Sequence, residues 1–391
     1  MRRVHLTMIG LCLVCQSTPA PAQTRLDTLR THSRALLIRE GFSRFDWWVE
    51  PGSQPDTYHT NFPLVGGAVT FYAERDSLTV LVRPGEHRDF IVRVRDSINV
   101  VTRVSATAAY PRPRIVSGDT LAVQIVPFTV RDNRIYVDGT INGSGPLVMQ
   151  FDLGADGLNF NKDKLAKAPN IPWAATDVLV NSEGRNTVPS SRQVTIRLGA
   201  MEWTGQAIVQ TGNMKGYEDA IFGNSLFRDR VVEIDYDRQV LRIHPTMPPI
   251  GAAFVRHPLA LDNGVRPLIQ GDLLVDGEHI TEWYLFDTGH SGALLVSARQ
   301  NRDHRLSARL GAWLGFGSRR LFKARGFRIG DVELPPAMAV LERTMDVDQG
   351  AKYGGILGNA WLRRFNVILD NRQGALWLAP TREAKGEVAR R

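Results

Sequence analysis

The stretch WYLFDTGHSGALLV, Trp283–Val296, places a single acidic residue, Asp287, between two apolar runs. Burying a lone carboxylate is costly unless it is paired or hydrogen-bonded. A second stretch, LVMQFDLGADGLNF (Leu147–Phe160), has the same form around Asp152. We interpret the two stretches as copies of one turn that ends a buried strand, so that each acid has the other as its partner.

The two turns belong to a repeat with a period of 135 residues. The offset between Asp152 and Asp287 also separates Gly223 from Gly358 in the matching segments IFGN and ILGN. Self-similarity at a fixed period indicates a duplicated structural unit. Each half is therefore predicted to contain a hairpin, an Asp-x-Gly turn, a variable middle and a final pair of strands.

Strand patterns dominate both halves. Apolar runs such as Val148–Phe151 and Phe365–Leu369 alternate with Gly, Asn and Asp turns, and helical patterns are short, as at Asn161–Ala168. We predict a mainly all-β protein whose two lobes span residues 125–248 and 249–380. The glycine-bearing turns within the variable middles, 180–199 and 314–334, are candidate flaps.

The first 22 residues have the pattern of a secretory signal peptide. Arg2 and Arg3 precede a short apolar core, and Ala20-Pro21-Ala22 is a small-residue cleavage site. This core is too short to span a bilayer, and no later segment is apolar enough to be a transmembrane segment. We expect cleavage near Ala22 and a periplasmic or extracellular mature chain.

The remaining regions flank the repeat. Residues 23–120 are predicted to form a small N-terminal β-rich domain that begins with a helix over Leu26–Glu40. The Pro-rich segment Tyr110–Asp119 is the expected linker, and residues 381–391 are expected to be a polar tail.

Composition excludes several kinds of chemistry. The formal charge of +8 falls to +6 without the signal peptide and forms no concentrated patch, so nucleic acid is not an expected partner. Both cysteines, Cys12 and Cys15, lie in the signal peptide, which leaves no disulfide and no cysteine nucleophile. The nine histidines show no metal-ligand spacing, so neither a metal nor another cofactor is expected.

The duplicated Asp turns, each followed by a hydrophobic-hydrophobic-Gly segment, resemble the pattern of the pepsin and retropepsin aspartic proteases. The segment GGILGNAWLRRFNVILDNRQGALWL (Gly354–Leu378) is most similar to the retropepsin-like proteases of bacteria. The resemblance covers about residues 125–380. It implies a bilobal acid-protease-like double β-barrel, a polypeptide substrate, and a monomer in which one chain supplies both turns.

Two neighbouring carboxylates suit peptide hydrolysis. They cannot both ionise easily, so they share one proton and titrate as a unit. One then activates water as a base while the other protonates the amide as an acid. Asp152 and Asp287 are the predicted catalytic pair, and Gly154 and Gly289 lack the side chains that would block their approach.

The two turns differ in their second residue. Thr288 matches the family, in which each threonine hydroxyl bonds into the opposite turn, whereas Leu153 replaces the other threonine. Leucine cannot make that hydrogen bond, and a lost buried hydrogen bond costs about 1–3 kcal/mol when its partner is left unsatisfied. We expect a loosened site that still has both carboxylates.

Residues after each turn are candidate substrate contacts. Ala155-Asp156 matches the retroviral Asp-Thr-Gly-Ala-Asp pattern, which implies that Asp156 contacts the substrate backbone. His290 and Ser291 follow the second turn. The His290 ring either touches substrate and perturbs the pair or points outward, and the sequence leaves both open.

Three hypotheses about function follow. The first is an aspartic-type endopeptidase. The second, motivated by Leu153 and His290, is a catalytically impaired pseudoprotease or peptide-binding protein of the same fold. The third is a homodimer of single active lobes, which the repeat within one chain disfavours. The segment GHSGA (Gly289–Ala293) lacks the last glycine of a serine-hydrolase elbow, so serine chemistry is not expected.

Overall fold

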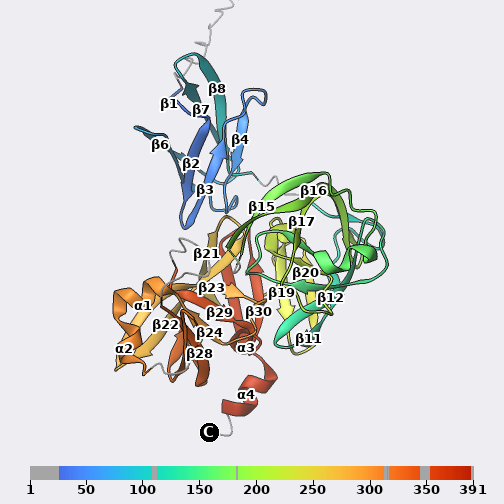
Figure 1. The fold of residues 1–391 in the computed structure, drawn as a ribbon, viewed down its shortest axis with the longest axis vertical. Coiled ribbons are helices and arrows are strands. Elements are labelled where there is room, and N and C mark those ends of the chain that lie inside the picture. The colour runs from blue at the N-terminus through green and yellow to red at the C-terminus, as the bar shows by residue number, and fades with distance from the viewer. Residues whose placement is uncertain are drawn as a thin grey trace, which may run out of the picture.

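The computed structural model describes residues 26–107, 112–181, 184–311, 315, 317–343 and 353–388. The predicted signal peptide and the middle of the predicted linker lie outside these residues. The expected all-β, bilobal fold is confirmed, since strands dominate and form two lobes beneath a small N-terminal β-domain. Figure 1 shows this domain in blue above the first lobe, in green, and the second lobe, in orange and red.

The N-terminal domain is a sandwich of two four-stranded sheets. One sheet has the order β1 (Thr28–Thr31), β7 (His87–Val94), β8 (Ile98–Ser105), β4 (Asp56–His59), and the other has the order β3 (Ser43–Trp48), β2 (Ala35–Glu40), β5 (Gly67–Tyr72), β6 (Ser77–Val82). Phe71 and Phe90 meet between the sheets, with ring centroids 4.9 Å apart. Aromatic packing of this kind joins the two faces into one core.

The helix predicted over Leu26–Glu40 is wrong, because β1 and β2 occupy this segment. Leu36 and Ile38 are buried while their neighbours face outward, which is the period of two expected of a strand. The segment also contains the turn between β1 and β2, so that β1 joins one sheet of the sandwich and β2 joins the other.

The first lobe is a nine-stranded sheet. Its strands are β9 (Arg114–Ile115), β11 (Thr129–Arg131), β12 (Arg134–Ile141), β13 (Leu147–Phe151), β14 (Leu158–Asn161), β15 (Ala175–Asn181), β16 (Gly184–Leu198), β17 (Met201–Thr211) and β18 (Ala220–Phe222). Because β9 pairs with β17, part of the predicted linker Tyr110–Asp119 belongs to the lobe sheet.

The sheet of the second lobe extends into a series of strands, here called the strip, to which both lobes contribute. The strip is β10 (Gln124–Pro127), β20 (Val240–His244), β19 (Val231–Asp235), β30 (Phe365–Asp370), β31 (Ala375–Pro380) and β21 (Val255–Asp262). The lobe proper adds β22 (Arg266–Val275), β23 (Glu278–Asp287), β24 (Leu294–Val296), β25 (Arg319–Ala324), β26 (Phe327–Ile329), β27 (Val332–Leu334), β28 (Ala337–Glu342) and β29 (Gly355–Gly358). Antiparallel pairing of β19 with β30 fixes the lobes together at the middle of this strip.

The strands that carry the two Asp turns are paired in the same way. In lobe 1, β13 runs parallel to β18, which lies antiparallel to β14. In lobe 2, β23 runs parallel to β29, which lies antiparallel to β24. Phe151 pairs with Phe222 and Phe286 with Leu357, so each Asp leaves its sheet at the same point of the lobe.

Helices are few and short among the described residues. They are the 3-10 segments η1 (Lys162–Lys167) and η2 (Asn224–Phe227) and the α-helices α1 (Ala298–His304), α2 (Leu306–Arg309), α3 (Asn359–Leu362) and α4 (Arg382–Val388). The tail expected from residue 381 onward thus begins with a docked helix, since Ala384 is buried and the Arg382 amide donates to Asp237. No helix within the described ranges is long and apolar enough to cross a membrane.

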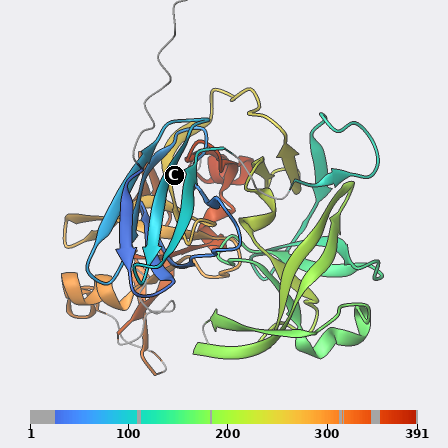
Figure 2. The same ribbon diagram turned by 90° about the horizontal axis from the view of Figure 1, so that it is seen from above.

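The N-terminal sandwich is attached mainly to the second half of the chain. Seen from above in Figure 2, its blue strands lie over the orange and red half and leave the green lobe uncovered. The Ser43 hydroxyl donates to Leu261 O at 2.9 Å and accepts from Gly264 N at 2.8 Å. The Phe42 ring packs on Trp283, with centroids 5.1 Å apart.

Candidate active site

The two predicted catalytic acids face each other across the lobe interface. Asp152 follows β13 and Asp287 ends β23. A Cβ placed on Gly154 would lie 2.6 Å from Asp287 Cγ, and one on Gly289 would lie 2.3 Å from Asp152 Cγ. Any side chain at either glycine would therefore displace the opposite carboxylate, which explains the glycine in each turn.

The two carboxyl groups form one electrostatic unit. Burial raises the pKa of Asp152 well above its ordinary value of 3.8, and the charge of Asp287 and a hydrogen bond between the two side chains raise it further. The Asp287 Oδ1 accepts from the amides of Gly289 and His290 at 2.7 and 2.8 Å, whereas Asp152 accepts from the Gly154 amide at 2.7 Å. Backbone donors favour an ionised carboxylate, so we assign the shared proton to Asp152 and the charge to Asp287.

Thr288 makes the cross-lobe hydrogen bonds predicted for it. Its hydroxyl donates to Phe151 O at 2.8 Å and accepts from Leu153 N at 3.0 Å, and its side chain is fully buried. Leu153 is also fully buried and contributes to the apolar core. The hydrogen bonding between the turns is therefore one-sided, as the sequence predicted.

The glycines of the IFGN and ILGN segments permit close backbone approach behind each turn. A Cβ on Gly223 would meet Ala155 O at 2.1 Å, and one on Gly358 would meet Gly292 O at 2.2 Å. These distances are far shorter than any non-bonded contact allows, so both positions need glycine. Ala155 itself lines the cleft beside Gly154.

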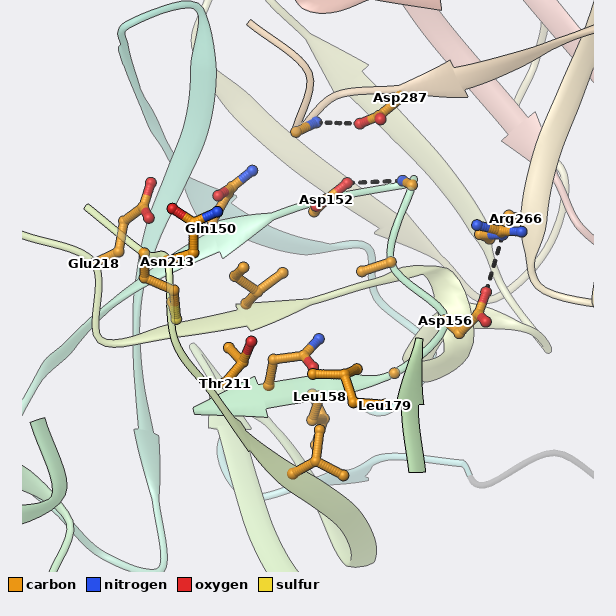
Figure 3. Close-up of a pocket in the computed structure, with 18 of the residues that line it drawn as sticks. Gln150, Asp152, Asp156, Leu158, Leu179, Thr211, Asn213, Glu218, Arg266 and Asp287 are labelled. Carbon is orange, nitrogen blue, oxygen red and sulfur yellow. Dashed lines mark hydrogen bonds and ion pairs between the residues drawn. The ribbon is translucent and has the colours of Figure 1, made fainter. Parts of the chain in front are cut away.

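Asp156 lies at the cleft in an ion pair that spans the lobes. Its Oδ1 is 3.0 Å from Arg266 Nε, and Asn263 Nδ2 donates to its Oδ2 at 3.3 Å (Figure 3). Arg266 is mostly buried and also pairs with Asp262 of its own lobe. Lobe 2 thus holds the segment that follows the first catalytic turn.

Lobe 1 holds the second turn in the reciprocal way. Arg134 Nε donates to Gly289 O at 2.7 Å, and Asn133 Nδ2 donates to Ser291 O at 3.1 Å. Arg134 is the first residue of β12, which forms a hairpin with β13, the strand that precedes Asp152. Arg266 is likewise the first residue of β22, which forms a hairpin with β23, the strand that ends at Asp287. Sequence reasoning missed both arginines, although Arg134 and Arg266 stand at matching places in the two hairpins.

His290 and Ser291 are not among the residues that line the cleft, whereas Asp156 is. The His290 ring packs against the backbone of the ILGN segment, because a Cβ on Gly358 would lie 2.5 Å from its Cδ2. Burial, together with the positive charge of Arg134, lowers the pKa of His290 to about 4. The ring is therefore neutral at ordinary pH and is positioned behind the turn.

The cleft between the lobes has a volume of about 670 Å³, which is within the usual range for ligand sites. Both carboxylates, Asp152 and Asp287, line it, and most of its remaining wall comes from lobe 1. The candidate flap of residues 180–199 belongs to the hairpin of β15 and β16; residues 177–179 of β15 reach the cleft, and the tip at 182–183 lies outside the described residues. The described residues of the second candidate flap, 315 and 317–334, are not among the cleft lining.

The part of the chain that the structure describes contains no group of three or more His, Cys, Asp or Glu side chains able to hold a metal ion.

No protein-family model matches the sequence, and no curated protein matches it. Among solved structures, the chain is similar to the crystal structure of an aspartic proteinase from Irpex lacteus, with a TM-score of 0.48 and 13% sequence identity over 67% of this chain and 98% of that chain.

Proposed function

We propose that the protein is an aspartic-type endopeptidase that hydrolyses polypeptides with Asp152 and Asp287. The observation that carries this proposal is the mutual contact of the two carboxyl groups, each seated against the glycine of the opposite turn. A buried pair that shares one proton is poised to act as base and acid together.

In the proposed reaction, a water molecule between the carboxyl groups attacks the peptide carbonyl carbon. Asp287, held ionised by two backbone amides, accepts the proton of that water. Asp152, whose raised pKa keeps it protonated, donates its proton to the carbonyl oxygen. The tetrahedral intermediate then collapses: Asp287 gives the proton that it took from water to the nitrogen, a hydroxyl of the intermediate returns a proton to Asp152, and the C–N bond breaks.

Contacts around Asp152 and Asp287 hold the two carboxyl groups in position relative to each other. Arg134 and Arg266 each fix the turn of the opposite lobe, and Thr288 ties the two turns together at their base. Positioning of this kind matters because small displacements of reacting groups lower catalytic rates strongly. The cleft opens mainly along lobe 1, where an extended peptide has room beside β15.

A second candidate function is a peptide-binding protein of the same fold without turnover. It is favoured by one observation, the buried Leu153 in place of a hydroxyl-bearing residue. Without a hydroxyl at position 153, one side of the hydrogen bonding between the two turns is missing. This loosens the carboxyl pair while leaving the cleft intact.

The test is an assay of the wild type and of Asp287→Asn on a broad peptide library from acidic to neutral pH. The endopeptidase proposal expects cleavage by the wild type and none above background by the variant. Undiminished cleavage by Asp287→Asn would refute the proposal. Peptide binding by the wild type without any cleavage, also after Leu153→Thr, would favour the binding protein.

A further inference from the structure

Gln150 lies on β13, two residues before Asp152, so the two side chains face the same side of the strand. Its neighbours across the sheet are Tyr136 of β12 and Ile221 of β18. Both Gln150 and Ile221 line the cleft. Figure 3 draws Gln150 on the pocket wall together with Asn213 and Glu218.

The Gln150 carboxamide belongs to a nearly enclosed residue but keeps access to the cleft, since it is not among the fully buried polar atoms that lack a partner. Its residue is 4% exposed, and no group among the described residues hydrogen-bonds its carboxamide. A carboxamide placed in this way is hydrogen-bonded either by water or by a bound ligand. Because this amide faces the cleft, a bound substrate is in position to supply the partner.

The matching position in lobe 2 is apolar. Leu285 stands two residues before Asp287 and pairs with Leu268 and Ile356. These three residues form one apolar cluster, against which Phe42 of the N-terminal domain packs. The two sides of the catalytic pair therefore differ: one offers an unpaired amide, and the other offers an aliphatic surface.

The charge around Gln150 favours a neutral ligand group. The Glu218 carboxylate already accepts from the Tyr136 hydroxyl at 2.5 Å and from the Lys215 amide at 2.6 Å, and Arg134 lies 3.9 Å from it. The Glu218 carboxylate is therefore already paired and is not available to bind a basic side chain of the substrate. A carboxamide, which both donates and accepts, is complementary to the carboxamide of Gln150.

We propose that Gln150 is a specificity-determining residue that selects glutamine or asparagine at one of the two substrate positions flanking the cleaved bond. The position on the other side is selected by Leu285 and its neighbours for an aliphatic residue. This inference rests on the proposed peptidase function and adds the substrate class of the site.

The first test compares kcat/KM for matched peptides that carry Gln, Leu, Lys or Glu at each flanking position. The wild type is expected to favour Gln over Leu by about 10-fold at one position, since a site built to hydrogen-bond a polar group discriminates against analogues that lack it. Gln150→Leu, which copies the lobe 2 residue, is expected to abolish or invert this preference. Leu285→Met serves as the matched control and is expected to keep the amide preference.

The second test uses non-cleavable peptides with a hydroxyl group in place of the cleaved bond and measures binding by calorimetry. The wild type is expected to bind the Gln form about 10-fold more tightly than the Leu form, and Gln150→Leu to lose that difference. Cleavage with equal or greater preference for Leu, Lys or Glu at both positions would overturn this inference and leave the peptidase proposal standing. Absence of cleavage with a retained Gln preference in binding would overturn the peptidase proposal and leave the amide subsite standing.

Discussion

Thr288 and Leu153 occupy the same position in the two Asp turns, yet the hydroxyl of Thr288 alone of these two side chains bonds across the lobe interface. It contacts both the carbonyl of Phe151 and the amide of Leu153. One hydroxyl therefore serves the role that two would share in a symmetric site.

Replacing Thr288 with valine should destabilise the protein by about 2–3 kcal/mol, because two buried backbone groups lose their partner. Chemical denaturation measures this change in the free energy of unfolding. Thr281→Val is the matched control, since Thr281 is exposed and its hydroxyl donates to Asp272 in its own lobe. Equal, small effects from both variants would contradict the role assigned to Thr288.

The raised pKa of Asp152 predicts a stability that falls with rising pH. A carboxyl group whose folded pKa lies above its ordinary value of 3.8 is fully stabilising below that value and loses its contribution as pH rises through the folded pKa. Asp152→Asn should match the wild type near pH 3.8 and become progressively more stable than it at higher pH. Asp138→Asn, at an exposed position of β12, should show no such divergence. A constant difference between wild type and Asp152→Asn across this range would argue against a shared proton.

His290 predicts the opposite slope between pH 4 and 6.5. Because its folded pKa of about 4 lies below the ordinary 6.5, its contribution is present above pH 6.5 and is lost as pH falls toward 4. His290→Asn should remove roughly 3 kcal/mol of acid-dependent destabilisation between these values, measured as Tm or denaturation midpoint against pH. His279→Asn, exposed on β23, is the control. Parallel pH profiles for His290→Asn and the wild type would show that the ring is solvated.

Ser43 links the N-terminal sandwich to the catalytic turn of lobe 1. Its hydroxyl holds Leu261 and Gly264, and the loop they flank carries Asn263, which contacts Asp156. Ser43→Ala should cost about 1–3 kcal/mol in unfolding free energy and should also lower kcat/KM, because the loop that fixes the first turn is loosened. Ser77→Ala, exposed on β6, should change neither. Loss of stability with unchanged kcat/KM would limit the sandwich to a structural role.

The Asp turns and most strands were predictable because their signals are local or repeated in the chain. The period of 135 residues located Asp152 and Asp287, and solid apolar runs located strands such as β13 and β30. These patterns do not depend on how distant segments pack. The glycine at each turn was predictable for the same reason.

Features that depend on packing between distant segments were not predictable. The contacts of Arg134 and Arg266 arise only when each lobe reaches across to the other. The mistaken helix over Leu26–Glu40 has the same origin, since sheet partners in the sandwich override local preference. Gln150 also gave no local signal, because its lack of a partner is visible only once the strand is placed beside the cleft.

The most direct test of the central claim is calorimetric binding of a pepstatin-type inhibitor to the wild type and to Asp152→Asn and Asp287→Asn. The hydroxyl of such an inhibitor mimics the tetrahedral intermediate and needs a carboxyl pair that shares one proton. We predict tight binding by the wild type and binding weaker by about 100-fold or more in both variants, which corresponds to about 2.7 kcal/mol. Equal affinity of all three proteins, or no binding by the wild type, would contradict the claim that Asp152 and Asp287 act as one catalytic unit.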